Sequence, residues 1–369
     1  MPEHPSKLAG LNMLPETVQK LVCLLPGARP FSILQSDHRI SKAGMASQLD
    51  MFAKPVVDLR PQRRDAPARL KSRPVPTSLT DEEMVRKLED GGQYRVLRKL
   101  VPRQIAVSRR PEFQQLGVIL DTETTGLNHR SDEIIEIGLV AFTFDGFGSI
   151  GDVLGVYGGL HQPSKPIPPE ITRLTGITDE MVEGQMIDMQ RIHGLIEPAD
   201  LVIAHNAGFD RPFCEAFSNV FANKAWACSV SEIDWVSRGF EGTKLGYLIG
   251  QAGYFHDGHR AVDDCFALLE VLDRSVGEGG TPFEELLRTS GQSRVRIFAE
   301  HSPYEVKDHL KGRGYRWSDG SDGRPKSWWI EVDEDALPDE LHYLRSEIYR
   351  WEEADPPVQH LTAFDRFKA

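Results

Sequence analysis

Short apolar runs and amphipathic segments alternate through the middle of this chain, from residue 113 to residue 278. Three largely apolar runs, at 116–120, 134–144 and 201–204, predict buried strands. Asp145 to Gly148 predicts a hairpin turn from the second strand into a third around 153–160. Apolar stripes at helical spacing follow, most clearly in 189–196 and 261–276. A meander of three strands followed by strand–helix units predicts an α/β fold, with a mixed sheet flanked by helices.

Residues 1–79 lack this periodicity. Prolines at positions 55, 61, 67, 74 and 76 are interleaved with arginines and lysines, a composition that cannot bury enough apolar surface to fold. We therefore expect a largely disordered N-terminal arm. Thr80-Asp-Glu-Glu83 is a capping box that predicts a helix start, and a second short helix is expected over 94–101. Residues 80–112 are predicted to form a helical lead-in.

A glycine-rich break at 277–280 precedes a different pattern over residues 283–369. A strand at 295–298, a helix at 303–311, a hairpin through 314–332 and a helix at 335–351 predict a small α+β module. Its aromatic residues lie among basic side chains and could stack bases and hold phosphates. We expect most of them in the core, because tryptophan supplies much of the apolar burial in so small a domain. These aromatic residues are Tyr315, Trp317, Trp328 and Trp329.

Composition narrows the class of protein. A net charge of −12 argues against a protein that coats nucleic acid electrostatically, but it is compatible with an acidic pocket that needs divalent cations. The four cysteines form no C-x-x-C pair, so neither a disulfide framework nor a zinc ribbon is indicated. No apolar run reaches the length of a membrane span, and no secretory leader is recognisable. A cytoplasmic protein without a membrane partner is expected.

Four carboxylates are placed at the edges of predicted elements. Asp121 and Glu123 end the first strand on the same face, Asp210 follows the 201–204 strand, and Asp264 lies in the first turn of a helix. His259 precedes Asp264 by five residues. Carboxylates forced together repel one another unless cations lie between them, and hard oxygen ligands suit Mg²⁺ or Mn²⁺. The set is that needed for two-metal hydrolysis of a phosphodiester, with the histidine taking a proton from water.

Residues from about 115 to 276 resemble the DnaQ-like (DEDDh) 3′–5′ exonuclease family, which has a ribonuclease-H-like fold. The motifs that carry the resemblance are Asp121-Thr-Glu-Thr-Thr-Gly126, His205-Asn-Ala-Gly-Phe-Asp210 and His259-Arg-Ala-Val-Asp-Asp264. The resemblance implies two Mg²⁺ or Mn²⁺ ions and a catalytic histidine at His259. Its spacing selects Asp264 rather than Asp263. The implied metal ligands are Asp121, Glu123, Asp210 and Asp264.

The resemblance implies an enzyme that releases nucleoside monophosphates from DNA 3′ ends, single-stranded or frayed, in proofreading or repair. The first motif is more similar to that of the proofreading subunits of bacterial DNA polymerase III than to that of oligoribonucleases, so a polymerase is an expected partner. Two alternatives stay open. One is a 3′–5′ exoribonuclease, because the motifs act on the phosphodiester and do not recognise the sugar. The other is a replication adaptor whose nuclease domain is secondary.

The expected arm contains one isolated apolar pentapeptide, Gln48-Leu-Asp-Met-Phe52. It resembles the short motif by which bacterial replication proteins dock on the sliding clamp. Leu49, Met51 and Phe52 would fill an apolar pocket, and Gln48 would make a polar contact. A chance pentapeptide is the alternative. Met45 lies just upstream and is a second candidate for the start of the protein.

Overall fold

The structure is a computed structural model that describes residues 79–275, 279–321 and 323–368. The described residues fall within one compact unit that begins at Pro76. The predicted arm and the pentapeptide Gln48 to Phe52 lie outside the described residues. No helix in the described part of the chain is long and apolar enough to cross a membrane.

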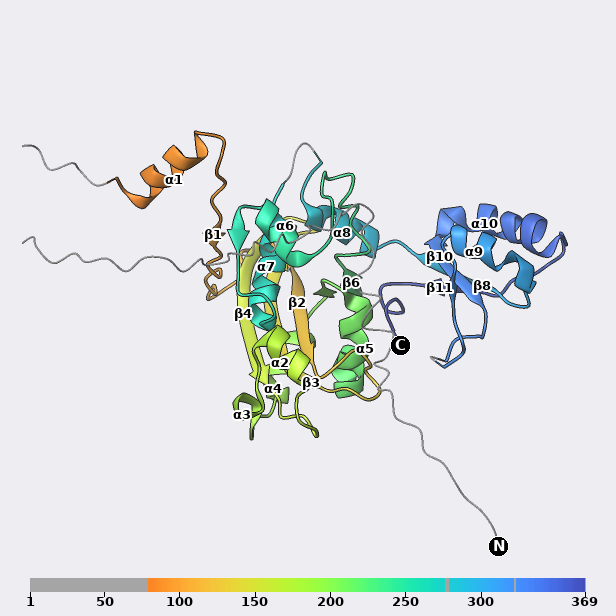
Figure 1. The fold of residues 1–369 in the computed structure, drawn as a ribbon, viewed down its shortest axis with the longest axis horizontal. Helices are drawn as coiled ribbons and strands as arrows, with labels where there is room; N and C mark the ends of the chain where they lie inside the picture. The colour runs from red at the N-terminus through yellow and green to blue at the C-terminus, as the bar shows by residue number, and fades with distance from the viewer. Residues whose placement is uncertain (1–78, 276–278, 322, 369) are drawn as a thin grey trace, which may run out of the picture. The chain divides into compact units, whose positions relative to one another are not determined.

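A five-stranded mixed sheet occupies the centre of the fold, in the order β4-β3-β2-β5-β6 (Figure 1). Strands β2, β3 and β4 form the predicted antiparallel meander, and β5 and β6 run parallel to β2. The prediction of a mixed α/β sheet is therefore confirmed. The strands are β2 (Gln115–Thr124), β3 (Ile134–Phe144), β4 (Ile150–Leu160), β5 (Leu201–Ala204) and β6 (Trp226–Cys228).

Helices cover both faces of this sheet because alternate residues of each strand point to opposite sides. On β2, Ile119 packs into one core, and Val118 and Leu120 pack into the other. Strand β3 is buried along its whole length, as expected of a strand with neighbours on both edges and helices on both faces. The first core includes residues of α6 (Leu245–Gln251), α7 (Ala261–Asp273) and α8 (Pro282–Ser290), and the second includes residues of α4 (Met189–Ile196) and α5 (Ala207–Phe217).

Between β4 and β5 the chain forms two further short helices, α2 (Pro169–Thr175) and α3 (Asp179–Val182). The first begins at a proline and ends at Gly176, whose positive φ of 72° forms the left-handed cap predicted for glycine there. Ile167, Ile177 and Val182 pack with Ile135 in a small separate core. This segment therefore packs against β3, next to the predicted metal site.

Of the two helices predicted in residues 80–112, the first is present and the second is not. Helix α1 (Asp81–Glu89) begins with the predicted capping box, in which Thr80 and Glu83 bond reciprocally. The second helix, expected over 94–101, is wrong. Strand β1 (Arg98–Lys99) lies there and pairs with β7 (Tyr254–Phe255) in a parallel ladder. Hydrogen bonds to a distant strand satisfy the backbone, and the local apolar spacing does not form a buried stripe, since Val101 is 78% exposed.

A second, four-stranded antiparallel sheet follows α8, in the order β11-β8-β10-β9 (Figure 1). Residues Val295, Ile297 and Ala299 of β8 lie in its core, and Arg294 and Arg296 alternate with them on the opposite face. Strand β11 was not predicted. The elements are β8 (Arg294–Ala299), β9 (Arg316–Trp317), β10 (Trp328–Asp333), β11 (Val358–Leu361), α9 (Lys307–Gly312) and α10 (Leu337–Tyr343).

The helix expected over 335–351 is divided in the structure. A 3₁₀ turn (Glu334–Ala336) leads into α10, and a π-helical segment (Leu344–Tyr349) follows it. Of the four aromatic residues noted above, Tyr315 is buried in the module's core, and Trp328 packs against that core. Trp317 is 51% exposed, so part of the module's aromatic surface faces solvent as expected.

Residues after β11 return to the five-stranded sheet. The carbonyl oxygen of Ala363 accepts a hydrogen bond from the backbone N–H of Trp226 at 2.8 Å, on the outer edge of β6. Arg211 of α5 is fully buried and donates to the carbonyl oxygens of Phe364 and Arg366 at 2.7 and 2.8 Å. The segment after β11 is therefore held by hydrogen bonds to both β6 and α5.

Candidate active site

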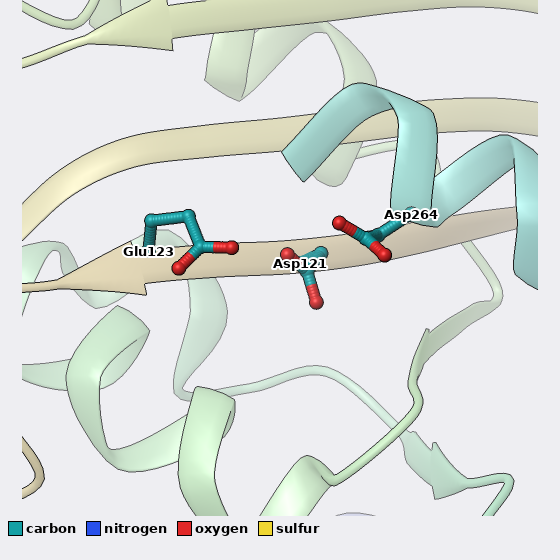
Figure 2. Close-up of side chains that lie close together, drawn as sticks. All are labelled: Asp121, Glu123 and Asp264. Atoms are coloured by element: carbon teal, nitrogen blue, oxygen red, sulfur yellow. The ribbon is translucent and has the colours of Figure 1, made fainter. Parts of the chain in front are cut away.

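Three predicted carboxylates meet at the carboxyl end of β2. Asp121 and Glu123 project from alternate positions of this strand, and Asp264 faces them from the first turn of α7 (Figure 2). One oxygen from each carboxylate can be chosen so that all three lie within 4.8 Å of one another. Residues 143 positions apart in the chain thus form one acidic cluster.

A glycine allows α7 to approach this closely. Gly138 of β3 is the ladder partner of Asp121, and a Cβ atom at Gly138 would lie 2.4 Å from the carbonyl carbon of Ala261. Any side chain at position 138 would therefore collide with the backbone at the start of α7. The glycine brings the first turn of α7, and Asp264 with it, against β2.

Hydrogen bonds fix the orientation of the Asp264 carboxylate. Its Oδ2 accepts from the backbone N–H of Arg260 at 3.0 Å, and its Oδ1 accepts from His256 Nε2 at 2.8 Å. Glu136 in turn holds the start of α7. Its carboxylate binds the Arg260 guanidinium, with Nη2 at 2.9 Å, and accepts from the backbone N–H of Ala261 at 3.1 Å. These polar contacts therefore fix the direction in which the Asp264 carboxylate points.

Asp210 lies beside the cluster, outside the group of three. It sits in the first turn of α5, and its Oδ1 accepts hydrogen bonds from the backbone N–H and the hydroxyl of Thr122, at 3.1 and 2.8 Å. Thr122 stands between Asp121 and Glu123 on β2. Asp210 is thereby fixed to the strand that carries the other two acidic groups.

Burial and mutual repulsion make these carboxylates hard to ionise in the protein alone. Burial, with added repulsion from Asp210 and Asp264, raises the pKa of Asp121 well above its usual range. The pKa of Glu123 rises to about 8 through burial and then through the nearby charge of Asp264. Burial raises the pKa of Asp210 to about 7, although the hydrogen bonds from Thr122 oppose the rise. A cation at this position would stabilise the ionised forms.

The two histidines of the sequence motifs occupy different environments. His259 lies at the rim with its side chain 54% exposed, and its Nδ1 is 3.9 Å from Glu123 Oε1. Its backbone has φ of 64°, a left-handed conformation that is uncommon outside glycine. His205 is enclosed, with Nε2 donating to the carbonyl of Thr243 at 2.6 Å and Nδ1 accepting from the Ser229 hydroxyl at 2.8 Å. Burial lowers the pKa of His205, consistent with a neutral structural residue.

Two polar residues of the site were missed in the sequence analysis. Glu136 is only 4% exposed, and its signal was a lone carboxylate within the apolar run 134–144. A charge in such a run requires a partner, which is Arg260. His256 gave a weaker signal, three residues before His259, and its contact with Asp264 depends on the path of the loop.

The donor set fits divalent metal ions of the hard class. Carboxylate oxygens are the preferred ligands of Mg²⁺ and Mn²⁺, and three of them converge here. Arg260 is held by Glu136, and its charge opposes the rise in the pKa of Glu123 without cancelling it. Among the described residues, these three carboxylates form the candidate metal site.

Comparison with known proteins identifies the family. The RNase_T family, described as exonuclease, matches residues 118–272, a range that contains the whole cluster. The epsilon subunit of DNA polymerase III from Treponema pallidum is 31% identical over 165 residues, which cover 42% of this chain and 74% of that protein. The chain belongs to the DnaQ-like 3′–5′ exonuclease family.

The PolC-type relatives of this DnaQ-like chain are much longer. A PolC-type DNA polymerase III from Thermotoga maritima is 30% identical over 177 residues, which cover 43% of this chain and 12% of the polymerase. The chain thus spans about an eighth of the length of the PolC-type relatives.

Among solved structures, Exonuclease X in complex with 5′-overhanging duplex DNA resembles this structure over 47% of this chain and 98% of its own, with 23% identity and a TM-score of 0.35.

Proposed function

We propose that this chain is a metal-dependent nuclease that shortens DNA from the 3′ end and releases nucleoside monophosphates. The observation that carries the proposal is the convergence of Asp121, Glu123 and Asp264 within 4.8 Å at the edge of an exonuclease-family sheet. The DNA substrate is supported by the relatives, which are named as parts of DNA polymerase III. Proofreading or repair is the corresponding role.

In the proposed site, Asp121, Glu123, Asp210 and Asp264 hold two Mg²⁺ or Mn²⁺ ions. The ions, when bound, polarise the phosphodiester and stabilise charge on the attacking and leaving oxygens. Asp210 approaches from α5 with one oxygen held by Thr122, so its Oδ2 is the atom available for ligation. Asp264 is held in place by His256 and the Arg260 N–H.

His259 is the proposed general base. Its exposed ring at the rim can reach a water molecule beside the cluster, and Nε2 would take the proton because Nδ1 faces Glu123. Glu123 Oε1 at 3.9 Å would stabilise the protonated imidazole that results. The left-handed backbone at His259 fixes the direction in which the ring leaves the chain.

A substrate comparison tests the proposal. Purified protein is incubated with single-stranded DNA, duplex DNA or RNA of one sequence, each labelled at its 5′ end, with Mg²⁺, Mn²⁺ or EDTA. We expect a ladder of DNA products that shorten by single nucleotides from the 3′ end, and no products in EDTA. Faster shortening of RNA would make the chain an exoribonuclease. If every substrate stays intact in every condition, the nuclease proposal is wrong and the alternative of a replication adaptor is favoured.

The sliding clamp and a DNA polymerase are the partners we propose. The clamp contact would use Gln48 to Phe52, whose apolar side chains suit a shallow apolar pocket. A peptide of residues 44–56 titrated against purified bacterial clamp tests it. Weak binding, with a Kd of roughly micromolar, is expected, and Leu49→Ala with Phe52→Ala should abolish it. Absence of binding at about 100 μM peptide would make the pentapeptide accidental.

A further inference from the structure

A basic pocket lies between the C-terminal module and the exonuclease domain. Its volume is about 510 Å³, and Asn206, Gly208 and Ser231 of the exonuclease domain form part of its wall. One lining residue, Glu331, is acidic within the part of the chain that the structure describes. We call this the arginine pocket, after its basic lining residues Arg294, Arg296, Arg316, Arg324, Arg366 and Lys368.

The module presents these arginines because its sheet has two chemically different faces. Arg294 and Arg296 alternate along β8 with the apolar residues of the core, and Arg316 on β9 is the ladder partner of Trp329 on β10. The face opposite the core is therefore basic. An antiparallel sheet commonly leaves one face polar, but here the polar positions are filled by arginines that gather around one pocket and create a local positive potential.

Trp329 organises the guanidinium groups. Its ring is 7% exposed, and the Cζ atoms of Arg296, Arg316 and Arg324 lie 5.2, 4.7 and 4.9 Å from the ring centroid. Cation–π contacts of this kind hold guanidinium planes while leaving their N–H groups able to bind an anion. With three cations around its ring and little exposed surface, Trp329 is a support for the arginines and offers no free face to a base.

Acidic neighbours neutralise part of this charge. Arg296 is paired with Glu331 at 2.6 Å, Arg366 with Glu232 at 3.2 Å, and Arg294 lies 3.6 Å from Asp333. Two other cations remain without such pairing: across residues 79–275, 279–321 and 323–368, no carboxylate lies within ion-pair distance of Arg316 or Lys368. The pocket is therefore suited to a ligand that carries negative charge.

The arginine pocket and the metal site share one edge of the five-stranded sheet. Strands β2, β5 and β6 are parallel neighbours, and Ile119, Ile203 and Ala227 align across them. Their carboxyl ends therefore point the same way, at a spacing of about 5 Å per strand. The first turn of α5 lies between the two sites, with Asn206 and Gly208 in the pocket wall and Asp210 beside the cluster.

We propose that the arginine pocket binds the phosphate backbone of the single strand whose 3′ end is hydrolysed at the metal site. This inference rests on the proposed function. The volume of the pocket falls in the range that holds ligands of drug-like size, so part of a single strand can enter it. The module thus provides a second contact for the substrate, on the same edge of the sheet as the metal site.

A binding measurement without metal tests the inference. The probe is a fluorescent single strand of about 20 nucleotides in EDTA, titrated at several salt concentrations. Arg316→Gln with Lys368→Gln should weaken binding about tenfold or more at low salt. The slope of log K against log salt should fall by about 1.4, since each phosphate contact on a single strand contributes about 0.7. A blunt duplex of the same sequence should lose no affinity.

The matched control removes two exposed charges outside the pocket. Lys87→Gln on α1 with Lys311→Gln on α9 changes net charge equally and should leave the affinity and the slope unchanged. Equal effects of the two double variants, or an equal loss on the duplex, would overturn the proposal. If the wild type hydrolyses no substrate in Mg²⁺ but the pocket variant still loses affinity for the single strand, the proposed function is refuted and the pocket proposal stands. If the wild type hydrolyses DNA but the pocket variant binds the single strand as tightly as the wild type, the pocket proposal is refuted and the proposed function stands.

Discussion

The acidic cluster and the arginine pocket lie on one edge of the same sheet. They carry charges of opposite sign, and they differ in how far neighbouring groups offset those charges. The carboxylates of Asp121, Glu123 and Asp264 crowd together, and the charge of Arg260, which is bonded to Glu136, offsets their repulsion only in part. In the pocket, by contrast, Arg296 has Glu331 as a partner and Trp329 beneath its guanidinium. The repulsion among the carboxylates of the cluster would be relieved by bound metal cations. The partly paired arginines of the pocket instead suit reversible contact with a long anion.

The largest effect should follow from removing one carboxylate of the cluster. Asp264→Asn should lower kcat by about 10⁴-fold or more, the scale seen when one member of a catalytic unit is lost. Asp263 is the matched control, because it neighbours Asp264 in the chain but lies outside the cluster. Asp263→Asn should retain most activity in a single-nucleotide release assay. Equal losses in both variants would remove the assignment of Asp264.

A smaller loss is expected at the rim. His259→Gln should reduce kcat by about 10³-fold at neutral pH, within the range for loss of a general base, and should abolish the acid limb of the pH–rate profile. His256→Gln should instead weaken Mg²⁺ binding by about tenfold, because His256 orients Asp264. Persistence of the acid limb in His259→Gln would contradict the role of His259.

The sequence predicted the sheet and the cluster because both depend on local pattern. The bounds of 134–144 follow from an uninterrupted run of strand residues, and Asp121 and Asp264 lie at element edges that periodicity locates. It did not predict that Phe283 of α8 packs against Phe142 and Phe144, although α8 opens the segment assigned to the module. That packing is a contact between distant segments, and local spacing carries no information about it.

The same limit applies to the second predicted helix of the lead-in and to strand β11. Both regions adopt their structure by hydrogen bonding to strands far along the chain, β7 in one case and β8 in the other. Glu136 was open to prediction, since a charge within an apolar strand requires a buried partner. Its partner, Arg260, lies 124 residues away and becomes identifiable only in the fold.

Comparison of Asp210 with its neighbour Arg211 leads to a prediction about stability. Both are buried on α5, but Arg211 is saturated by Glu215 and by carbonyl groups that follow β11. Arg211→Met should lower the free energy of unfolding by about 3 kcal/mol, because these acceptors would stay buried without a donor. Urea denaturation measures it. Arg86→Met, on exposed α1, should change the value by less than about 0.5 kcal/mol.

The smallest effect, measured per pH unit, is the pH dependence of the free energy of unfolding. In EDTA, Glu123 is protonated in both the folded and the unfolded protein below its unfolded pKa of about 4.3. At such pH values it therefore does not lower the free energy of unfolding. The folded pKa of about 8 means that ionisation is resisted in the folded state, and stability should fall as pH rises between these values. The slope from this group is at most about 1.4 kcal/mol per pH unit.

Glu123→Gln should flatten that part of the pH dependence and make the metal-free protein more stable at pH 8. Thermal unfolding in EDTA at several pH values measures the change, with Glu170→Gln on exposed α2 as the control. Addition of Mg²⁺ should stabilise the wild type more than the variant at pH 8. A wild type whose stability is independent of pH over this range would show that Glu123 is not repelled by its neighbours.

The carbonyl groups that bind Arg211 have a consequence for the order of biosynthesis. They lie 152 to 155 residues downstream of Arg211, so α5 leaves the ribosome well before its anchoring acceptors have been made. A nascent chain acquires Asp121 and Asp210 early, whereas the segment that closes over α5 arrives only after both sheets have been synthesised. During synthesis, the contacts of Arg211 with these carbonyl groups cannot form until residues 363–366 have been made. The helix that carries Asp210 therefore gains these hydrogen bonds later than its contact with Thr122 becomes available.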